Sequence, residues 1–382
     1  MSSIYLDFAA TTPIDPTVRS IMEPLLVGYF GNPHAEHSEA IGPAAAIALA
    51  AKQVADFMGA DPGEVVFTSG ATEANNAAIK GVMMSPQRRG RHLIVSSIEH
   101  SCVLESARAL ERAGCELTVI PVDSLGRVDP DDVAAAVTPH TALVSIMLMN
   151  NEIGTVQPLG EIAKVLSGKG IVFHTDAAQA AARISLNVAD LGVDLLSISG
   201  HKLYGPKGIG ALYVSADSPA QLEPLIHGGG QQAGRRGGTM PTFLCAALGA
   251  AVEVTSGKLL KNDRKTENAA EFLRQVRAAI SGTVLNGAEP TVADAIINLR
   301  FPGADATSVL QMLYGTVSAS MGSACHAGSL APSHVLQAIG LNETEAGESI
   351  RFSVGRTTTT DDIARAVIAL KSAVTAVRSI SL

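Results

Sequence analysis

Lys202 follows a predicted buried strand and is the residue of this chain best placed for covalent chemistry. Apolar residues at 193–198 predict the strand, and glycines and a proline at 205–210 indicate a tight turn. Lysine forms Schiff bases with carbonyl compounds, and pyridoxal phosphate needs one such lysine plus donors for its phosphate. Ser199 and His201 are candidate donors. The alternative is a solvated lysine in a glycine-rich loop.

A turn of small residues between a strand and a helix gives a second candidate phosphate site, with Ala71 and Thr72 at the helix start. A helix N-terminus supplies about half a positive charge, whereas a phosphate monoester carries about −1.5 to −2 near neutral pH. Further donors are therefore required, and Thr239 joins Thr72, Ser199 and His201 as a candidate. The alternative for Thr72 is a helix-capping hydroxyl.

Asp176 ends the predicted strand at 171–175, at the edge where open α/β sheets bind ligands. A carboxylate there can hold the pyridinium nitrogen of pyridoxal phosphate in its protonated state. Two charges ~4 Å apart at an effective dielectric near 20 attract by roughly 4 kcal/mol. Gln179 is a candidate donor to the phenolic oxygen of the ring. The alternative for Asp176 is a helix N-cap.

Three further positions complete the candidate site. His100 lies where a strand ends and a helix begins, so it is either a proton shuttle over the cofactor or a structural residue. Asn151 follows another apolar strand and offers an amide at the same sheet edge. Arg351 is a candidate clamp for a substrate carboxylate, because a guanidinium matches a carboxylate bidentately. Arg356 is the competing choice.

Cys325 lies in a loop of small residues, where a thiolate can act as a nucleophile. Cys102 and Cys245 fall within helical patterns and Cys115 begins a strand, so we expect these three to be small core residues.

The composition limits the possible classes of protein. A chain of 382 residues that are 47% hydrophobic is globular and large enough for two or three domains. Its formal charge of −8, without a basic block, argues against nucleic acid or an anionic membrane as a direct partner. Four scattered cysteines favour free thiols in the cytoplasm over disulfides, and no metal site is expected. No export signal or membrane-spanning run is recognisable.

Short apolar strands alternate with helical patterns over residues 64–214, which predicts an α/β fold with a mostly parallel sheet covered by helices on both faces. After about residue 255 the pattern changes to that of a smaller α+β domain. We therefore expect a large cofactor-binding domain at 13–255. Residues 1–12 and 256–382 are expected to form a small domain that carries the Cys325 loop.

Ten motifs distributed over essentially the whole chain resemble those of the NifS/IscS-type cysteine desulfurases, which are class-V, fold-type-I pyridoxal phosphate enzymes. In order they are YLDFAATTP, GNPHAEH, FTSGATEANN, EH at 99–100, NNEIGT, HTDAAQ, SGHKLYGPKGIGALYV, GGGQQAGRRGGT, GSACHAGS and RFSVGR. The combination of SGHKxxGPxGxG with the GSACH loop is highly specific. There are two departures: GNPHAEH lacks the serines that relatives often have after the proline, and Gly238 stands where many have a serine. Neither affects a proposed catalytic position.

The resemblance implies a role for each candidate. Lys202 would carry the cofactor, Asp176 would pair with the pyridine nitrogen and His100 would stack on the ring, while Cys325 would accept sulfur. It likewise implies that Gln179 and Asn151 contact the ring oxygen or the substrate. It also implies a homodimer in which Thr239 reaches the phosphate in the neighbouring subunit.

The expected activity is the removal of sulfur from L-cysteine, giving L-alanine and a persulfide on Cys325. Selenocysteine lyase, or another class-V lyase or aminotransferase, is the alternative enzyme, and a cofactor-free scaffold is the alternative of another class. The sequence leaves open the sulfur acceptor, with iron–sulfur cluster assembly and thiolation pathways among the candidates. It also leaves open whether the Cys325 loop binds a cluster or carries only a persulfide.

Overall fold

A seven-stranded sheet forms the centre of the computed structural model, which describes residues 3–219, 221–259, 265–289, 296–321 and 332–380. The strand order is β2-β8-β7-β6-β5-β3-β4. β8 pairs antiparallel with both β2 and β7, and the other pairs are parallel. The strands are β2 Val65–Thr68, β3 His92–Ser96, β4 Glu116–Ile120, β5 Thr141–Ser145, β6 Val172–Asp176, β7 Leu195–Ser199 and β8 Gly210–Val214.

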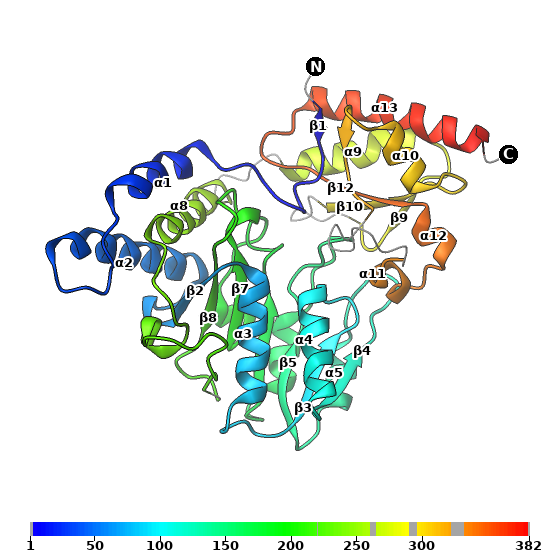
Figure 1. Cartoon of the computed structure of the whole chain (residues 1–382). Helices are drawn as coiled ribbons and strands as arrows, with labels where there is room; N and C mark the ends of the chain where they lie inside the picture. The colour runs from blue at the N-terminus through cyan, green and yellow to red at the C-terminus, as the bar shows by residue number, and fades with distance from the viewer. Residues whose placement is uncertain (1–2, 220, 260–264, 290–295, 322–331, 381–382) are drawn as a thin grey trace.

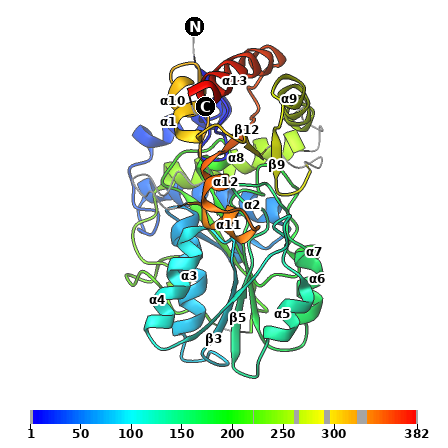
Figure 2. The same ribbon diagram turned by 90° about the vertical axis from the view of Figure 1, so that its right-hand side faces the viewer.

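Helices cover both faces of this sheet, with α3 and α4 on one side and α5, α6 and α7 on the other (Figure 2). Side chains alternate along the strands: Ile94 of β3 joins one apolar core, while its neighbours Leu93 and Val95 join the opposite one. The helices of this part are α1 Pro16–Gly28, α2 Ser38–Met58, α3 Ala71–Met84, α4 Ser101–Arg112, α5 Pro130–Ala136, α6 Leu159–Leu166, α7 Val188–Leu191 and α8 Thr242–Leu259.

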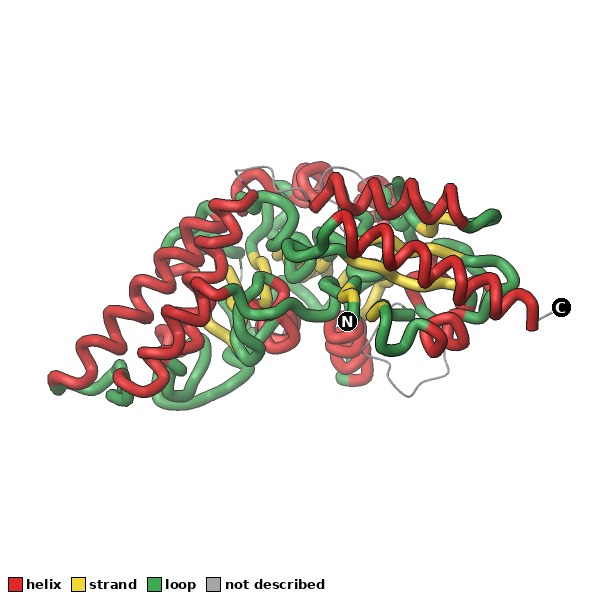
Figure 3. The backbone as a smooth tube through the Cα atoms, turned by 90° about the horizontal axis from the view of Figure 1, so that it is seen from above, coloured by secondary structure: helices red, strands yellow, loops and turns green. Residues whose placement is uncertain are grey.

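A separate apolar core lies beside the large sheet and combines the first strand with the C-terminal third of the chain. β12 pairs with β10, which pairs with β9, all antiparallel, and β1 pairs in parallel with β11. From above, α13 runs to the C-terminus with α9 alongside (Figure 3). The elements are β1 Ile4–Tyr5, α9 Lys265–Ala279, β9 Val284–Asn286, β10 Ile296–Arg300, α10 Ala306–Met312, β11 Val317–Ser318, α11 His334–Ala338, α12 Glu343–Gly347, β12 Ser349–Ser353 and α13 Thr360–Ile380.

The expected α/β fold with a mostly parallel, helix-covered sheet is confirmed, whereas the domain boundaries after residues 12 and 255 stay a prediction. Some element limits differ from the expected ones. β5 ends at Ser145 although the apolar run continues to Met149, because the chain leaves the strand while its side chains stay buried. The helix expected from Glu99 begins at Ser101, because the His100 side chain caps it.

α8 is the one helix in the described residues that is long and apolar enough to cross a membrane. Ten of its residues are buried, and it packs against α1 and α2. This packing accounts for its composition.

We expect Gly210→Ala to lower the free energy of unfolding by about 2 kcal/mol or more. A Cβ at this position would lie 2.5 Å from the Ile198 carbonyl oxygen and 2.7 Å from Gly70 Cα, and both atoms belong to backbone that cannot move aside. Urea denaturation measures the change. The matched control is Gly257→Ala in α8, where a Cβ meets nothing within 4 Å; equal stability of the two variants would contradict the prediction.

Candidate active site

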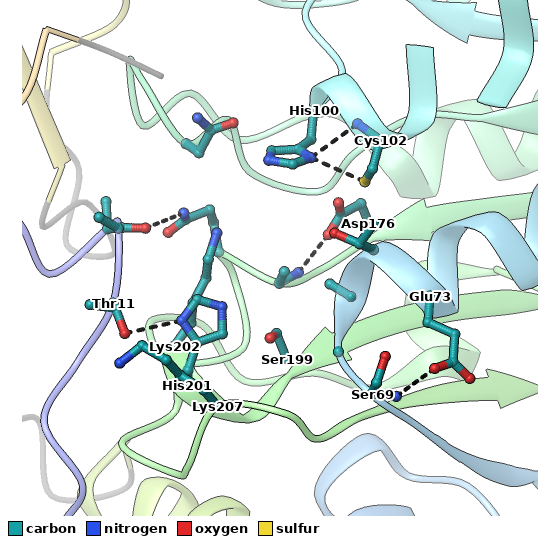
Figure 4. Close-up of a pocket in the computed structure, with 18 of the residues that line it drawn as sticks. Thr11, Ser69, Glu73, His100, Cys102, Asp176, Ser199, His201, Lys202 and Lys207 are labelled. Carbon is teal, nitrogen blue, oxygen red and sulfur yellow. Dashed lines mark hydrogen bonds between the residues drawn. The ribbon is translucent and has the colours of Figure 1, made fainter. Parts of the chain in front are cut away.

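A cavity of about 430 Å³ opens at the edge of the large sheet where its parallel strands end. It gathers most of the candidate residues, as Figure 4 shows. Ten of them line it: Ala71, Thr72, His100, Asn151, Asp176, Gln179, Ser199, His201, Lys202 and Arg351. The described residues also place Thr11, Cys102 and Lys207 in its wall.

The turn that carries Lys202 is held by backbone hydrogen bonds. It begins as a short 3₁₀ turn directly after β7, and Gly200 donates to the Ile209 carbonyl at 2.9 Å. The Gly200 carbonyl accepts from Leu203 and Gly205, both at 2.9 Å. A Cβ on Gly205 would lie 2.9 Å from that same carbonyl oxygen, so glycine is required for this close approach. The turn is therefore rigid, as the sequence predicts.

Asp176 ends β6 and is 6% exposed. Its Oδ2 accepts a hydrogen bond of 2.6 Å from Asn75 Nδ2, and its Oδ1 accepts from the Ala178 N–H at 2.9 Å. The bond from the Ala178 N–H to the Asp176 carboxylate resembles a helix cap, but the chain continues as a turn and not as a helix. The interpretation of Asp176 as a helix N-cap is therefore wrong, and the carboxylate also lines the cavity.

His100 likewise has a structural role and a position at the cavity. As N-cap of α4, its Nδ1 accepts from the Cys102 N–H at 3.2 Å. Because that backbone group is a donor, the proton of a neutral ring lies on Nε2. The ring projects toward the cavity in Figure 4.

Cys102 corrects an expectation, because it lines the cavity and is not only a small core residue. Its Sγ lies 3.0 Å from His100 Nδ1 and 3.2 Å from Asn75 Nδ2. Burial, with Asp176 nearby, raises the pKa of the Cys102 thiol to about 12. The group is therefore a neutral thiol near neutral pH and a poor nucleophile. Helical periodicity alone gave no sign that this helix face meets the site.

One end of the cavity offers anion donors. Gly70 occupies the N-cap position of α3, so the alternative of Thr72 as the capping residue is wrong, and Thr72 lies in the first helical turn. Ser199 is buried at the same wall. Burial, together with the positive charges of Lys202 and Lys207, lowers the pKa of His201 to about 4. His201 is consequently a neutral hydrogen-bonding group at neutral pH.

Glu73, in the first turn of α3, adds a negative charge near these donors, and Arg236 balances it. Arg236 Nε donates to Glu73 Oε1 at 2.9 Å, and the Ser69 N–H donates to Oε2 at 2.9 Å. In the sequence, Arg236 belongs to the motif GGGQQAGRRGGT, and its pairing with Glu73 was not predicted. The ion pair ties the 228–239 loop to the start of α3.

The structure separates the two candidate arginines. Arg351 lines the cavity, is 2% exposed, and donates from Nη2 to Asp7 Oδ1 at 2.7 Å and from Nη1 to the Asn151 carbonyl at 3.0 Å. Its Nε makes no hydrogen bond within the described part of the chain. Arg356 lies against Tyr204 and is not part of the cavity wall.

Gln179 is buried at the cavity, but its amide already has partners. Its Nε2 donates to the Ala9 carbonyl at 2.8 Å, and its Oε1 accepts from Arg183 at 3.1 Å. One hydrogen of the amide nitrogen is used in this way, so a hydrogen bond that Gln179 donates to a ligand must use the second hydrogen.

The remaining two candidates are Thr239 and Cys325. Thr239 is exposed and does not line the cavity of its own chain. Cys325 falls outside the described residues, so its predicted role remains a prediction.

Two residues that sequence reasoning missed support the site from behind. Asn75 is fully buried in α3 and holds Asp176. Glu99 is fully buried beside His100, and its Oε1 accepts from the Ser96 hydroxyl at 2.6 Å and the Met147 N–H at 2.8 Å. Asn75 belongs to the motif FTSGATEANN and Glu99 to EH at 99–100. Each is a polar residue close to the end of a predicted buried strand, and this position was the sequence feature that could have identified them.

Comparisons with known proteins agree with this architecture. Residues 4–366 match the model of the aminotransferase class-V family. Human cysteine desulfurase is 46% identical over 362 residues, which cover 94% of this chain and 79% of that protein. Cysteine desulfurase IscS of Rickettsia massiliae (strain Mtu5) is 42% identical over 380 residues, 99% of this chain and 92% of that one.

A solved structure gives the same result in three dimensions. SspA in complex with cysteine is 40% identical and superposes with a TM-score of 0.84, covering 94% of this chain and 100% of that chain. The fold and the cavity thus define a class-V aminotransferase of the fold-type-I group. Within that class, the chain belongs to the cysteine desulfurase family, whose members imply pyridoxal phosphate as cofactor. The predicted family and fold are confirmed.

We expect Glu99→Gln to be more stable than the unmodified protein at pH 9, by on the order of 3 kcal/mol, and to lose this advantage near pH 5. Burial raises the pKa of Glu99 from 4.5 to about 8, so the folded state retains a proton that the unfolded chain releases. The stability contributed by that proton is complete below pH 4.5 and is lost as the pH rises toward 8.

Urea denaturation at pH 5, 7 and 9 measures the difference between the two proteins. Glu105→Gln is the control, since Glu105 is an exposed residue of α4 that pairs with Arg108. Parallel stability curves for Glu99→Gln and the unmodified protein would contradict the neutral, buried state of Glu99.

Proposed function

We propose that the chain is a cysteine desulfurase that transfers the sulfur of L-cysteine to Cys325 with the help of pyridoxal phosphate. The observation that carries the proposal is the gathering of Lys202, Asp176 and Arg351 around one cavity. The reaction balances as L-cysteine plus the Cys325 thiol giving L-alanine plus the Cys325 persulfide. The family membership and the related SspA structure with bound cysteine support L-cysteine as the substrate.

The donor set of the cavity matches the chemistry of pyridoxal phosphate. An amine from Lys202 suits the aldehyde, the Asp176 carboxylate suits the pyridine nitrogen, and the start of α3 with Ser199 suits the phosphate. Gly70, with φ 151°, leaves the backbone at the start of α3 open to the cavity. When bound, the cofactor withdraws electron density from the α-carbon of the substrate.

Each protein group then has a defined task. The buried Arg351 binds the substrate carboxylate, with its Nε as an available donor. The Lys202 amine removes the proton from the α-carbon and later returns one, while His100 Nε2 holds a proton beside the reacting atoms. The Cys325 thiolate attacks the substrate sulfur, so that the carbon–sulfur bond breaks and a sulfur–sulfur bond forms.

A homodimer is part of the proposal. Several large apolar side chains of α1, α2 and their connection are exposed, among them Val27 at 82%, Phe30 at 84% and Ile41 at 70%. Such a patch favours association with another protein surface. Thr239, exposed on its own chain, is then free to serve the phosphate of the neighbouring subunit.

The chemistry of a persulfide indicates which class of protein would receive the sulfur. A protein that accepts sulfane sulfur must approach Cys325, as in iron–sulfur cluster assembly or a thiolation pathway. Free thiols at Cys102, Cys115 and Cys245 support a reducing compartment such as the cytoplasm.

We expect Cys325→Ala to retain bound pyridoxal phosphate and its visible absorption, while alanine formation from L-cysteine falls at least about 100-fold. The thiol is required as the sulfur acceptor, whereas the cofactor is held by other residues. Cys115→Ala is the matched control, because Cys115 does not line the cavity. Unchanged turnover by Cys325→Ala would overturn the assigned role.

Reduction of the cofactor-loaded protein with borohydride is expected to fix one label on the peptide that contains Lys202. Mass spectrometry of the digested protein locates the label. Lys202→Arg should carry no label and lose its activity by about 100-fold or more. A label on Lys207, the other lysine in the described wall of the cavity, would refute the proposed attachment site.

A further inference from the structure

Arg356 is a buried arginine that the proposed reaction does not use. It follows β12 five residues after Arg351, and its side chain is 5% exposed although it lies outside the cavity wall. Burial of a guanidinium is costly unless its hydrogen bonds and charge are satisfied. The contacts of Arg356 therefore indicate what it does.

Its contacts converge on Tyr204. The Arg356 N–H donates to Tyr204 Oη at 2.8 Å, and the guanidinium carbon lies 4.0 Å from the centre of the Tyr204 ring. This is the geometry of a cation–π contact, which is strengthened when both groups are desolvated. Nη2 also donates to Thr255 Oγ1 at 2.7 Å, and Nη1 lies 3.8 Å from the Asp15 carboxylate. One side chain thus joins three separate segments.

Tyr204 is conformationally unusual and lies two residues after Lys202. Its φ of 62° places it in the left-handed region, which a bulky aromatic residue adopts only when its surroundings hold it there. Its N–H donates to Thr12 Oγ1 and its carbonyl accepts from the Asp15 N–H, both at 2.9 Å. The same segment contacts the lysine turn directly, since the Thr12 N–H donates to the His201 carbonyl at 2.9 Å.

We propose that Arg356 is a positioning residue for Lys202, which fixes the Tyr204 ring and backbone and thereby sets the direction in which Lys202 leaves its turn. The inference rests on the proposed attachment of the cofactor to Lys202. It assigns different tasks to the two arginines of RFSVGR: Arg351 faces the substrate cavity, and Arg356 supports the lysine turn from the other side. Because Arg351 lies in β12 and Arg356 follows it closely, a shift of this strand reaches the carboxylate site and the lysine turn together.

The test compares Arg356→Lys, Arg351→Lys and Tyr204→Phe in cofactor-loaded protein, with Arg365→Lys on the surface of α13 as the control. Arg356→Lys keeps the charge but loses the planar contact with the ring. Three quantities are measured: kcat and KM with L-cysteine as substrate, and the pH midpoint of the visible absorption change of the lysine–cofactor linkage.

We expect Arg356→Lys to lower kcat by about 10-fold to 100-fold with KM nearly unchanged, because a small displacement of a reacting group has effects of this size. The absorption midpoint should move by at least about half a pH unit, since the environment of the Lys202 nitrogen changes. Arg351→Lys should instead raise KM about 10-fold or more and leave the midpoint unchanged. Tyr204→Phe, which keeps the ring but loses the hydroxyl acceptor, should shift the midpoint less than Arg356→Lys.

A rise in KM without a shifted midpoint in Arg356→Lys would overturn the proposal, because it would make Arg356 the carboxylate clamp. Wild-type values of kcat and midpoint in that variant would also overturn it. If Arg356→Lys does not fold, the test uses Tyr204→Phe instead. An unchanged absorption midpoint in folded Tyr204→Phe would then overturn the proposal. Failure of the underlying function is distinguishable, since the unmodified protein would then show no cofactor absorption.

Discussion

The site depends on the parallel pairing of β6 with β7. The register places Asp176 opposite Ser197, so the chain leaves β6 and β7 at the same edge of the sheet. Asp176 is the last residue of its strand, and Lys202 comes three residues after the end of its neighbour. A change of register by one residue would turn Asp176 to the other face of the sheet. The carboxylate and the amine therefore line one cavity because of the backbone pairing of β6 with β7.

Around this pair, burial reduces the charge of neighbouring groups. Burial lowers the pKa of His174 to about 4 and raises that of Glu99 to about 8, so both are neutral near pH 7. His174 lies between the hydroxyls of Ser145 and Ser197, at 2.8 Å and 3.1 Å, which satisfy its ring nitrogens without a charge. The two buried groups behind the cavity wall therefore add no charge near pH 7, and the charges of Asp176, Lys202 and Arg351 act more strongly than they would in water.

The sequence was sufficient to predict which residues lie at the cavity where their position depends only on the end of a strand. Asp176, His100 and Lys202 each follow an apolar run, and the carboxyl ends of parallel strands necessarily converge. It was insufficient where the position depends on packing between distant segments. Cys102 has the helical spacing of a core residue, yet its helix is placed so that the thiol meets Asn75 and the cavity.

The choice between Arg351 and Arg356 shows the same limit. Both arginines lie in one short segment with similar surroundings in sequence, and only the tertiary structure reveals that one meets Asp7 and the other meets Tyr204. The limits of β5 were missed for a related reason. An apolar run records burial, and burial continues after Ser145 although strand pairing does not.

The ion pair between Asp7 and Arg351 has a consequence for synthesis in the cell. It joins residues separated by 344 positions in the sequence. The hydrogen bond from Ser353 to the Leu6 carbonyl joins residues separated by 347 positions. During translation the amino-terminal segment therefore leaves the ribosome long before its partners exist. The end of the cavity that contains Arg351 is assembled only after residues 349–353 have emerged and have paired with the first residues of the chain, so the cavity wall stays incomplete in any nascent chain that lacks them.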